Sequence, residues 1–427
     1  MKKFLLVKLH PKDMRSQNKT VHLGLEIIAK TIRDEGWQLD IKNHWEFIDN
    51  VYDYDVIGFS IFYVTHTLNL LPFLEKYRLR DNDKRPLLVA GGRGILNPEP
   101  VYKYVDVFFI GEAEDNLRLL LRQRENYQNL ADVTGIYIPQ IHHQFNFDYS
   151  IKNIIDSEPV VSGKRAVIEL TRGCRHKCSF CQYSFTSGRY REKDFELLKK
   201  QILDVKELGV RIINFMSANL GSYSRIRELL EFCIDNKMKI INADFRIDDY
   251  LKIADLLEKL GLRVLKVGIE SFNSDYRKRM NKNISDEILR IALKTALEKS
   301  ITTIHFYLIY GLPNETDYQN WFNFIKYLSL LRADIPYRVR FEFNLTNFEP
   351  DTHTEFGKES FINFHNKENE FFPEYFRALK ENGFVKQDMK PDYGTMTGRL
   401  GRSIEAYSIT MWLTFDGREI ADMLEEI

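Results

Sequence analysis

The chain has 427 residues, of which 44% are hydrophobic and 29% charged, a balance typical of a globular protein with two or three domains. Its 61 lysine and arginine residues equal its 61 aspartate and glutamate residues, so no overall field favours nucleic acid or a membrane surface. No apolar run approaches the length of a transmembrane helix, which excludes a membrane-embedded chain.

The first residues resemble the start of a signal peptide only as far as Lys8. The apolar run Phe4–Val7 ends there, and His10, Pro11 and Lys12 follow, so a signal-peptide core does not form. We therefore expect a cytosolic protein.

Residues 1–125 alternate between buried-strand and helical patterns, as in a doubly wound parallel sheet. Leu23–Glu35 has helical spacing. The apolar strand candidates are Phe4–Leu9, Asp55–Ser60, Pro86–Ala90 and Val105–Ile110. About five strands with helices between them predict a flavodoxin-like α/β domain.

Residues 126–162 are polar and turn-rich, which predicts a linker. Over residues 163–350 the pattern becomes strand followed by helix. The six strand candidates are Ala166–Leu170, Arg211–Met216, Lys239–Phe245, Arg263–Ile269, Thr303–Tyr310 and Arg338–Leu345. Because six β/α units fall short of the eight of a closed barrel, we expect a partial (β/α)6 barrel of the TIM type. Residues 351–427 would form a small C-terminal α+β extension.

Three of the four cysteines, Cys174, Cys178 and Cys181, form a C-x3-C-x2-C triplet directly after the first barrel strand. Barrel active sites lie at this end of the strands. Three thiolates can hold three irons of a [4Fe–4S] cluster and leave the fourth iron open to a small molecule. A zinc site or inert thiols are the alternative. A structural zinc site needs a fourth ligand, however, and His176 lies between two of the cysteines in the sequence, where it has little room to complete a tetrahedral site.

This triplet, with Phe180 before the third cysteine and the upstream segment Glu169–Gly173, resembles the signature of the radical S-adenosylmethionine (SAM) superfamily. The resemblance covers residues 163–350 and implies a [4Fe–4S] cluster with SAM on its open iron. It further implies reductive cleavage of SAM to a 5′-deoxyadenosyl radical, with the electron delivered by a partner such as flavodoxin or ferredoxin.

The same resemblance implies SAM contacts at several strand ends. Glu270 and Ser271 end the fourth strand and could bind the ribose or ammonium group, and a helix N-terminal acid is the alternative for Glu270. Arg246 ends the third strand and would pair with the SAM carboxylate or form a surface salt bridge. Ile309 would pack against adenine or belong to the core.

One segment departs from the family pattern. Many members carry a Gly-Gly-Glu-like segment after the second strand, where this chain has Met216–Leu220, so Ser217 or Asn219 would contact the amino group of SAM. No residue stands out as a catalytic acid, base or radical relay.

Cys233, the fourth cysteine, lies in register with apolar residues of a helical segment, as a buried free thiol does. The sequence therefore offers no ligands for a second cluster. This argues against enzymes that need one, methylthiotransferases among them.

A flavodoxin-like sheet ahead of such a barrel resembles the arrangement in class B radical SAM methyltransferases, where methylcobalamin lies between sheet and barrel. The retained strand-end features are Ser60, Gly91, Gly92, Gly111 and Glu112, where backbone would approach a large cofactor. Residues 10–24 lack the Asp-x-His-x-x-Gly spacing that puts histidine on cobalt. The alternative is a domain that has this fold but no longer binds a corrin.

The main hypothesis is a radical SAM enzyme that methylates an unactivated carbon with the help of cobalamin. The alternative is a cobalamin-free isomerase, epimerase or oxidase whose N-terminal domain docks the substrate. A third hypothesis is a non-enzymatic sensor of SAM or cobalamin. The sequence does not identify the substrate, and it gives no sign of a membrane or nucleic-acid partner.

Overall fold

The computed structural model describes residues 2–10, 22–62, 64–80, 82, 84–96, 98–142, 145, 149–241, 244–299, 301–313, 319–335, 339–348, 353–358 and 377–382. The described residues form two compact units, one ending at Asn153 and the other beginning at Ile154. The predicted C-terminal extension, 351–427, lies almost entirely outside the described residues.

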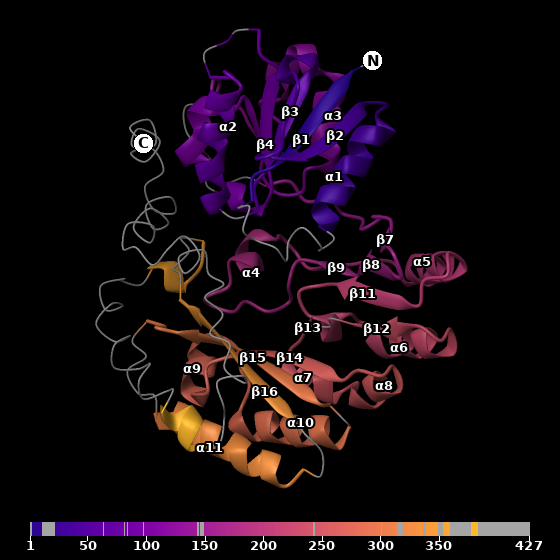
Figure 1. Cartoon of the computed structure of the whole chain (residues 1–427), viewed down its shortest axis with the longest axis vertical. Coiled ribbons are helices and arrows are strands. Elements are labelled where there is room, and N and C mark those ends of the chain that lie inside the picture. The colour runs from indigo at the N-terminus through magenta and orange to yellow at the C-terminus, as the bar shows by residue number, and fades with distance from the viewer. Residues whose placement is uncertain are drawn as a thin grey trace. The chain divides into compact units, whose positions relative to one another are not determined.

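A six-stranded sheet in the order β2-β1-β3-β4-β5-β6 forms the centre of the first unit (Figure 1). Its strands are β1 (Lys3–Lys8), β2 (Gln38–Asn43), β3 (Val56–Ser60), β4 (Leu87–Gly91), β5 (Val107–Phe109) and β6 (Ile136–Tyr137). The first five run parallel, and β6 runs antiparallel to β5. The flavodoxin-like order that the sequence predicts is confirmed, with the strand order reversing beside β1.

Both faces of this sheet are covered by helices. Helices α1 (Leu23–Asp34) and α3 (Glu114–Arg122) lie on one face and α2 (Leu70–Lys76) on the other (Figure 1). Within β1, Phe4 and Leu6 pack towards α1 and α3, whereas Leu5 and Val7 pack towards α2. Because β1 is buried on both faces, it shows a continuous apolar run rather than an alternation.

Short connections of the first unit are 3₁₀ helices: η2 (Val51–Asp53), η3 (Val64–Asn69), η4 (Arg93–Leu96), η5 (Glu99–Tyr104) and η6 (Arg124–Leu130).

Two strands of this sheet were not expected from the sequence. Strand β2 (Gln38–Asn43) is an edge strand of alternating polar and apolar residues, so it lacks the apolar run by which its neighbours were found. Strand β6 (Ile136–Tyr137) lies within the predicted linker 126–162, and the backbone of Gly111 also bridges to Ser150. The first unit therefore extends to about residue 153 rather than to 125.

The second unit contains a half-barrel of parallel strands. In one sheet β8 (Arg165–Glu169), β11 (Ile212–Met216) and β12 (Lys239–Ile240) run parallel, and β7 (Val160–Ser162) adds to β8 in the antiparallel direction. The second sheet contains β13 (Asp244–Phe245), β14 (Val264–Glu270), β15 (Thr303–Tyr310) and β16 (Arg340–Asn347), all parallel. All six predicted barrel strands are present, and the third is divided into β12 and β13.

Helices alternate with these strands. They are α5 (Phe195–Glu207), α6 (Ile226–Asp235), α7 (Ile247–Leu251), α8 (Ala254–Lys259), α9 (Ser274–Arg279), α10 (Asp286–Glu298) and α11 (Gln319–Ala333). Local sequence sets where they begin: Asp194 caps α5 by accepting from the amide of Leu197 at 2.9 Å, and Ser285 caps α10 by accepting from Ile288 at 3.2 Å. The described helices include none with the length and hydrophobicity needed to span a bilayer.

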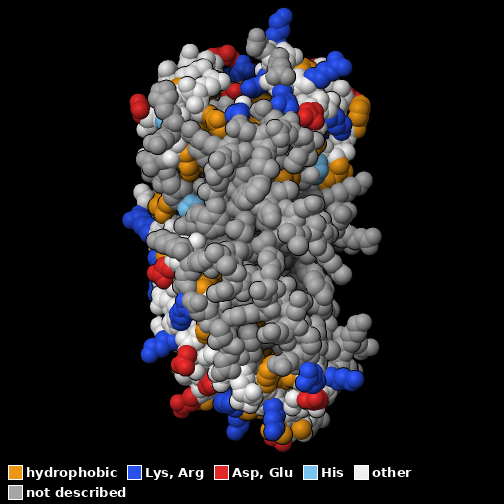
Figure 2. Space-filling view, turned by 90° about the vertical axis from the view of Figure 1, so that its left-hand side faces the viewer, with side chains coloured by type: hydrophobic (Ala, Val, Ile, Leu, Met, Phe, Trp, Pro, Cys, Tyr) orange, Lys and Arg blue, Asp and Glu red, His pale blue; other side chains and the backbone are white. Residues whose placement is uncertain are grey.

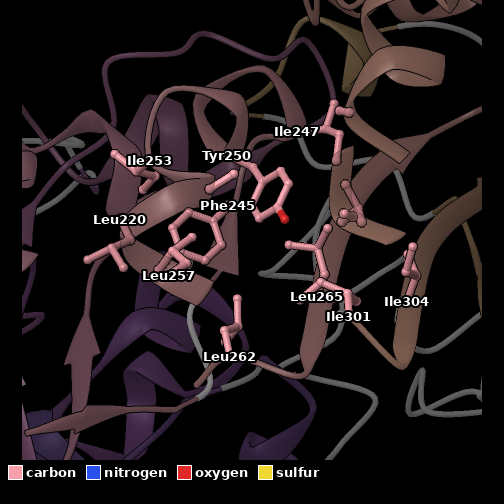
Figure 3. Packing of buried hydrophobic residues seen from close by; sticks show 14 of the residues in the cluster. Leu220, Phe245, Ile247, Tyr250, Ile253, Leu257, Leu262, Leu265, Ile301 and Ile304 are labelled. Atoms are coloured by element: carbon pink, nitrogen blue, oxygen red, sulfur yellow. The ribbon is translucent and has the colours of Figure 1, made fainter. Parts of the chain in front are cut away.

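The outer face of the half-barrel packs against the helices in one large apolar core. Figure 3 shows part of it, which includes Phe245 of β13, Leu257 of α8 and Leu265 of β14. On α11, Phe324 stacks on Phe272 with ring centroids 4.7 Å apart. The surface is mixed: in Figure 2, lysine and arginine side chains are interspersed with aspartate and glutamate on the described surface, in keeping with a net charge of zero.

One prediction concerns the packing of the first sheet. A methyl group added at Gly58 in β3 would lie 2.7 Å from two ring atoms of Phe4, a side chain that is itself only 1% exposed. We expect Gly58→Ala to lower the free energy of unfolding by about 1–3 kcal/mol through overpacking. Gly24→Ala in α1, with no atom within 4 Å of the added methyl, is the matched control and should instead stabilise by up to about 1 kcal/mol. Urea unfolding followed by circular dichroism measures both, and equal effects would contradict the packing argument.

Candidate active site

The cysteine triplet lies on a loop that follows β8 and is closed at its base by a short hairpin. Strand β9 (Thr171–Arg172) pairs antiparallel with β10 (Arg191–Glu192), and α4 (Gln182–Thr186) lies between them. Gly173 starts the loop with a φ of 77°, and a Cβ there would lie 2.6 Å from the carbonyl oxygen of Arg189. Only glycine fits this turn, which directs the chain away from the barrel wall and into the cysteine segment.

The cysteine loop is also held from two distant parts of the second unit. The backbone amide of Ser179 donates to the carbonyl oxygen of Met280 at 3.0 Å, and the amide of Phe356 donates to the carbonyl oxygen of Ser179 at 3.0 Å. The side-chain amide of Asn281 donates to the carbonyl oxygen of Lys177 at 2.8 Å. These bonds join the loop to the segment after α9 and to a segment beyond β16.

Cys178 is buried, and Cys174 and Cys181 are half-buried. Burial raises the pKa of the Cys178 thiol to about 11, although nearby Lys282 and Arg246 act in the opposite direction. Burial also raises the pKa of Cys174, and the charge of Cys181 acts on both of the other thiols, so the three lie near one another. Without a metal to replace their protons, Cys174 and Cys178 are therefore protonated at neutral pH.

No three histidine, cysteine, aspartate or glutamate side chains of the described ranges are close enough to share one metal ion. In a cubane cluster each cysteine binds a different iron, so the three thiols of this loop need not meet at one metal ion. His176 contacts a residue outside the cysteine loop: its Nε2 lies 3.4 Å from the side-chain amide of Asn219.

Glu270 ends β14 in an unusual backbone conformation. Its φ is +64°, and the register between β14 and β15 shifts between Gly268 and Glu270, as at a β-bulge. The carboxylate forms an ion pair with the Lys282 ammonium at 2.7 Å, and both side chains are largely buried. A Cβ at Gly268 would lie 2.8 Å from the Glu270 carboxylate, so glycine makes room for the pair.

Lys282 was missed in the sequence because a lysine between two asparagines after a short helix looks like a solvated loop. It lies instead 5.9 Å from the centroid of the Phe180 ring, and its charge acts on Cys178. Its backbone amide donates to the carbonyl oxygen of Arg277, a fully buried arginine that also bonds the carbonyl oxygens of Ser271 and Ile284. Ser271 thus supports this turn from a buried position.

Arg246, predicted to hold the SAM carboxylate or to form a surface salt bridge, is 9% exposed. Its Nε and Nη2 lie 3.2 and 3.4 Å from the carboxylate of Asp248. Its Nη1 is buried and has no hydrogen-bond acceptor among the described residues. A buried guanidinium nitrogen without an acceptor costs free energy, so this position suits an anionic ligand.

Asn219 is fully engaged by protein. Its Nδ2 donates to Ser222 Oγ at 2.7 Å and to Asp249 Oδ2 at 2.6 Å, and its Oδ1 accepts from the backbone amide of Arg246 at 3.1 Å. It therefore positions Arg246 rather than offering a group to a ligand. Ser217 is half-buried and makes no hydrogen bond within the part of the chain that the structure describes.

Phe180 and Ile309 meet in one small apolar cluster, although 129 positions separate them in the sequence. Ile309, 9% exposed at the end of β15, belongs to a cluster with Met280, Leu312, Phe348 and Phe356. Phe180 of the cysteine loop packs against the same cluster. The structure thus brings Phe180 and Ile309, which belong to two separate sequence motifs, to one apolar cluster beside the cysteine loop.

A buried polar group beneath the hairpin was not predicted. Glu169 forms a bidentate ion pair with Arg172 at 2.9 and 3.0 Å and accepts from the Ser157 hydroxyl at 2.5 Å. Lys193 donates to the carbonyl oxygen of Ser157 at 2.6 Å, and burial lowers the pKa of its ammonium to about 8. The polar groups of these residues form hydrogen bonds and ion pairs with one another, so we interpret them as stabilising the hairpin.

In the first unit, the predicted glycines are explained by the protein's own backbone. A Cβ at Gly92 would lie 2.4 Å from the carbonyl oxygen of Ile61, and one at Gly111 would lie 2.5 Å from that of Ser150. The Glu112 carboxylate accepts from the amide of Lys152 at 2.8 Å. At Gly91, by contrast, an added Cβ would meet only ordinary contacts at 3.5 Å or more.

Ser60 ends β3 beside Gly91, and it keeps the position predicted for it at the carboxyl edge of the sheet.

Four histidines that the sequence did not single out gather at this carboxyl edge. His10 follows β1, and His66 lies in η3 after β3, with ring centroids 6.5 Å apart. Burial, together with the charges of His10, His44 and His22, lowers the pKa of His66 to about 3. The switch point of the strand order lies between β1 and β3, where ligands of open α/β sheets bind.

Comparison with known families covers both units. Residues 168–325 match the family described as "Radical SAM superfamily", and residues 40–139 match "Radical SAM proteins, N-terminal". The chain belongs to the radical SAM superfamily. It is therefore an enzyme whose chemistry uses SAM and a [4Fe–4S] cluster.

Relatives are found among proteins of several activities. An uncharacterized protein of Methanocaldococcus jannaschii is 26% identical over 352 residues, covering 79% of this chain and 75% of that protein. The tRNA-2-methylthio-N(6)-dimethylallyladenosine synthase of Psychrobacter cryohalolentis is 25% identical over 351 residues, covering 74% of this chain and 68% of the relative.

The fold is similar to two solved radical SAM enzymes. The methyltransferase TsrM from Kitasatospora setae, solved with tryptophan and a SAM analogue, has a TM-score of 0.61 at 14% identity, covering 84% of this chain and 75% of TsrM. The cobalamin-dependent enzyme OxsB, solved with aqua-cobalamin, has a TM-score of 0.64 at 16% identity, covering 87% of this chain and 62% of OxsB.

One prediction from this site tests the buried ion pair. In this radical SAM enzyme, Lys282→Met would leave the buried Glu270 carboxylate without its counter-ion, at a cost of about 3 kcal/mol or more in the free energy of unfolding. Glu270→Gln combined with Lys282→Met should recover much of that loss, because no buried charge remains. Urea unfolding of the single and double variants gives the coupling energy, and strictly additive effects would show that the pair is not coupled.

A second prediction concerns pH. The pKa of His66 in the folded state lies below its ordinary value of 6.5, so the unfolded chain takes up the proton first as pH falls. The associated stability is complete above about pH 6.5 and declines below it, by about 2 kcal/mol at pH 5. Protection factors of peptides covering β1 and β3, which are corrected for the intrinsic pH dependence of amide exchange, should therefore fall between pH 7 and 5 more in the wild type than in His66→Gln. Identical pH dependence of the two proteins would contradict the assignment.

Proposed function

We propose that this enzyme cleaves SAM at a single [4Fe–4S] cluster held by Cys174, Cys178 and Cys181 and methylates an unactivated carbon with the help of cobalamin. The observation that carries the proposal is the combination of a cysteine triplet at the mouth of a half-barrel with a flavodoxin-like sheet in the same chain. Of the solved enzymes of similar fold, TsrM was solved with cobalamin and a [4Fe–4S] cluster and OxsB with aqua-cobalamin.

The cysteine loop fits a cluster because the protein fixes it from several sides. The hairpin β9–β10 holds one end of the loop, and Ser179 is bonded to Met280 and Phe356 at the other. The neighbouring cations Arg246 and Lys282 favour thiolates over thiols. When bound, the cluster supplies the electron that breaks the carbon–sulfur bond of SAM, and we propose that a flavodoxin or ferredoxin replenishes it.

We propose that each part of SAM is contacted by side chains of matching chemistry. The unpartnered Nη1 of Arg246 would hold the carboxylate, oriented by Asp248 and by the bond from Asn219 to the backbone of Arg246. Glu270, held by Lys282, would accept from the ribose or the ammonium group. The apolar cluster with Ile309 and Phe180 would border adenine and exclude water from it.

For cobalamin, the supporting feature is the carboxyl edge of the first sheet rather than its glycines. The buried imidazoles of His10 and His66 lie at the switch point between β1 and β3, and His66 stays neutral there. Ser60 and Gly91 lie at the same edge, and a Cβ at Gly91, unlike one at Gly92 or Gly111, would meet only ordinary contacts. Cobalamin would supply the methyl group to the substrate radical.

A methylthiotransferase is the function that relatives such as the Psychrobacter tRNA synthase suggest. The chain has four cysteines in all, and the one outside the triplet, Cys233, is 0% exposed within α6. A second cluster has no ligands here, which favours methylation. A bacteriochlorophyllide methyltransferase of Chlorobaculum tepidum, 26% identical over 208 residues, covers 46% of this chain and 43% of its own length.

The alternative is a cobalamin-free isomerase, epimerase or oxidase. It is favoured by one observation, that Gly92 and Gly111 are required by internal backbone contacts and so give no support for a corrin. Absorbance of the protein purified from cobalamin-supplied cells separates the two, because bound corrin absorbs beyond the bands of the cluster.

The proposed chemistry predicts two readouts under anaerobic, reducing conditions. Wild-type protein with methyl-labelled SAM should form 5′-deoxyadenosine and transfer label, whereas Cys178→Ala should lose both its iron and the 5′-deoxyadenosine. Cys233→Ala is the matched control and should retain both, since that thiol is distant in sequence from the loop. Deoxyadenosine formed without label transfer would refute methylation alone; activity in Cys178→Ala would refute the cluster assignment.

A further inference from the structure

Asp249 is a buried carboxylate that the proposed SAM contacts do not use. It lies in the first turn of α7 and is 7% exposed. Its Oδ2 accepts from the side-chain amide of Asn219 and its Oδ1 from the Lys252 ammonium, each at 2.6 Å. Burial acts to raise the pKa of Asp249, but these two bonds outweigh it and lower the pKa below its ordinary value. A charged group is therefore buried three residues after Arg246, at a cost that its partners have to offset.

The Asp249 carboxylate fixes which way the side-chain amide of Asn219 faces. Asn219 Oδ1 accepts from the backbone amide of Arg246 at 3.1 Å, and that group can only donate. Asn219 Nδ2 faces Asp249 Oδ2, which can only accept, and its second hydrogen is bonded to Ser222 Oγ at 2.7 Å. A flipped amide would set oxygen against carboxylate and NH2 against N–H. Only one orientation is therefore compatible with the network.

Close packing of two segments brings this network together. Strand β11 leads into the 3₁₀ turn η7 (Leu220–Ser222). A Cβ at Gly221 would lie 2.4 Å from the Cβ of Asp249, so glycine is what allows η7 to approach α7. On α7, Ile247 and Tyr250 are 0–1% exposed and belong to the core that Figure 3 shows. Asp249 is thus carried by a helix that is itself anchored in the core.

Arg246 is held on both sides of its backbone by the same network. Its N–H donates to Asn219, and its carbonyl oxygen accepts from the amides of Asp249 and Tyr250, each at 3.0 Å. Its side chain lies 3.2 and 3.4 Å from the carboxylate of Asp248, which leaves the buried Nη1 without an acceptor among the described residues. The position of Nη1 therefore depends on where Asn219 and Asp249 hold the backbone.

We propose that Asp249 and Asn219 are positioning residues that give the site its selectivity for the carboxylate of SAM. The inference rests on the proposed function, in which Arg246 holds that carboxylate, and adds the network that keeps Nη1 in place. A guanidinium fixed before the ligand arrives loses little freedom on binding, which favours affinity. A ligand without the carboxylate makes no bond to Arg246, so its affinity should not depend on the network.

The test compares SAM with decarboxylated SAM, which lacks only that carboxylate, by calorimetry on the reconstituted full chain. Asn219→Asp puts a second carboxylate against Asp249, and Asp249→Asn leaves one oxygen to accept from both Asn219 and Lys252. We expect each single variant to lower the affinity for SAM about tenfold and to change that for decarboxylated SAM less than about twofold. Asn219→Asp combined with Asp249→Asn exchanges amide and carboxylate and should recover the affinity for SAM to within about threefold of wild type.

Asp204→Asn is the matched control, because this aspartate of α5 likewise pairs with a lysine, Lys200 at 2.7 Å, but lies outside the network. It should bind both ligands as the wild type does. Three results would each overturn the positioning role: unchanged affinity for SAM in the single variants, equal weakening of both ligands, or no recovery in the double variant. Iron content of every sample verifies that a weaker affinity does not come from loss of the cluster.

Arg246→Met reports on the proposed function separately. It should lower the affinity for SAM at least as much as the single variants do, and leave that for decarboxylated SAM unchanged. Wild-type protein that binds the two ligands equally would refute the contact between Arg246 and the carboxylate, and this inference with it. Discrimination in the wild type that is lost in Arg246→Met but kept in Asn219→Asp and Asp249→Asn would refute the positioning role alone.

Discussion

Parallel strands end at one edge of a sheet, and in both units of this protein this constraint decides where functional side chains can lie close together. In the second unit, the cysteine loop follows β8, Asn219 follows β11 and Arg246 follows β13. Glu270 and Ile309 end the next two strands. Residues from five separate segments thus surround one mouth, although none of them is adjacent in sequence to the next.

Holding these strand ends in place costs backbone strain and buried charge. The bulge at Glu270 requires a left-handed backbone conformation, which is unfavourable for a glutamate, and the ion pair with Lys282 holds the carboxylate there. Lys282 is held in turn through Arg277, whose guanidinium is wholly buried. Strain that persists only because its surroundings determine it is characteristic of functional sites.

The two faces of the half-barrel carry different kinds of side chain, apolar on the outer face and polar on the inner face. The outward residues of β14–β16 join a single apolar core with α10 and α11, whereas Lys266, His305 and Glu342 on the inward side lie outside it. Those inward positions are therefore able to carry lysine, histidine and glutamate without loss of the fold. In the first unit, where both faces of the sheet are covered, polar groups gather only at the edge, as His10 and His66 do.

The sequence by itself determined the cysteine triplet, the superfamily, the flavodoxin-like sheet and the six barrel strands, because each depends on local spacing or on apolar periodicity. It missed β2 and β6, which are short or polar edge strands, and it interpreted Gly92 and Gly111 as cofactor contacts although their own backbone neighbours require them. Only the tertiary structure revealed Lys282 beside Cys178, the unpartnered Nη1 of Arg246 and the histidines at the sheet edge. These depend on which distant segments meet, and long-range contacts leave no periodic signal in the chain.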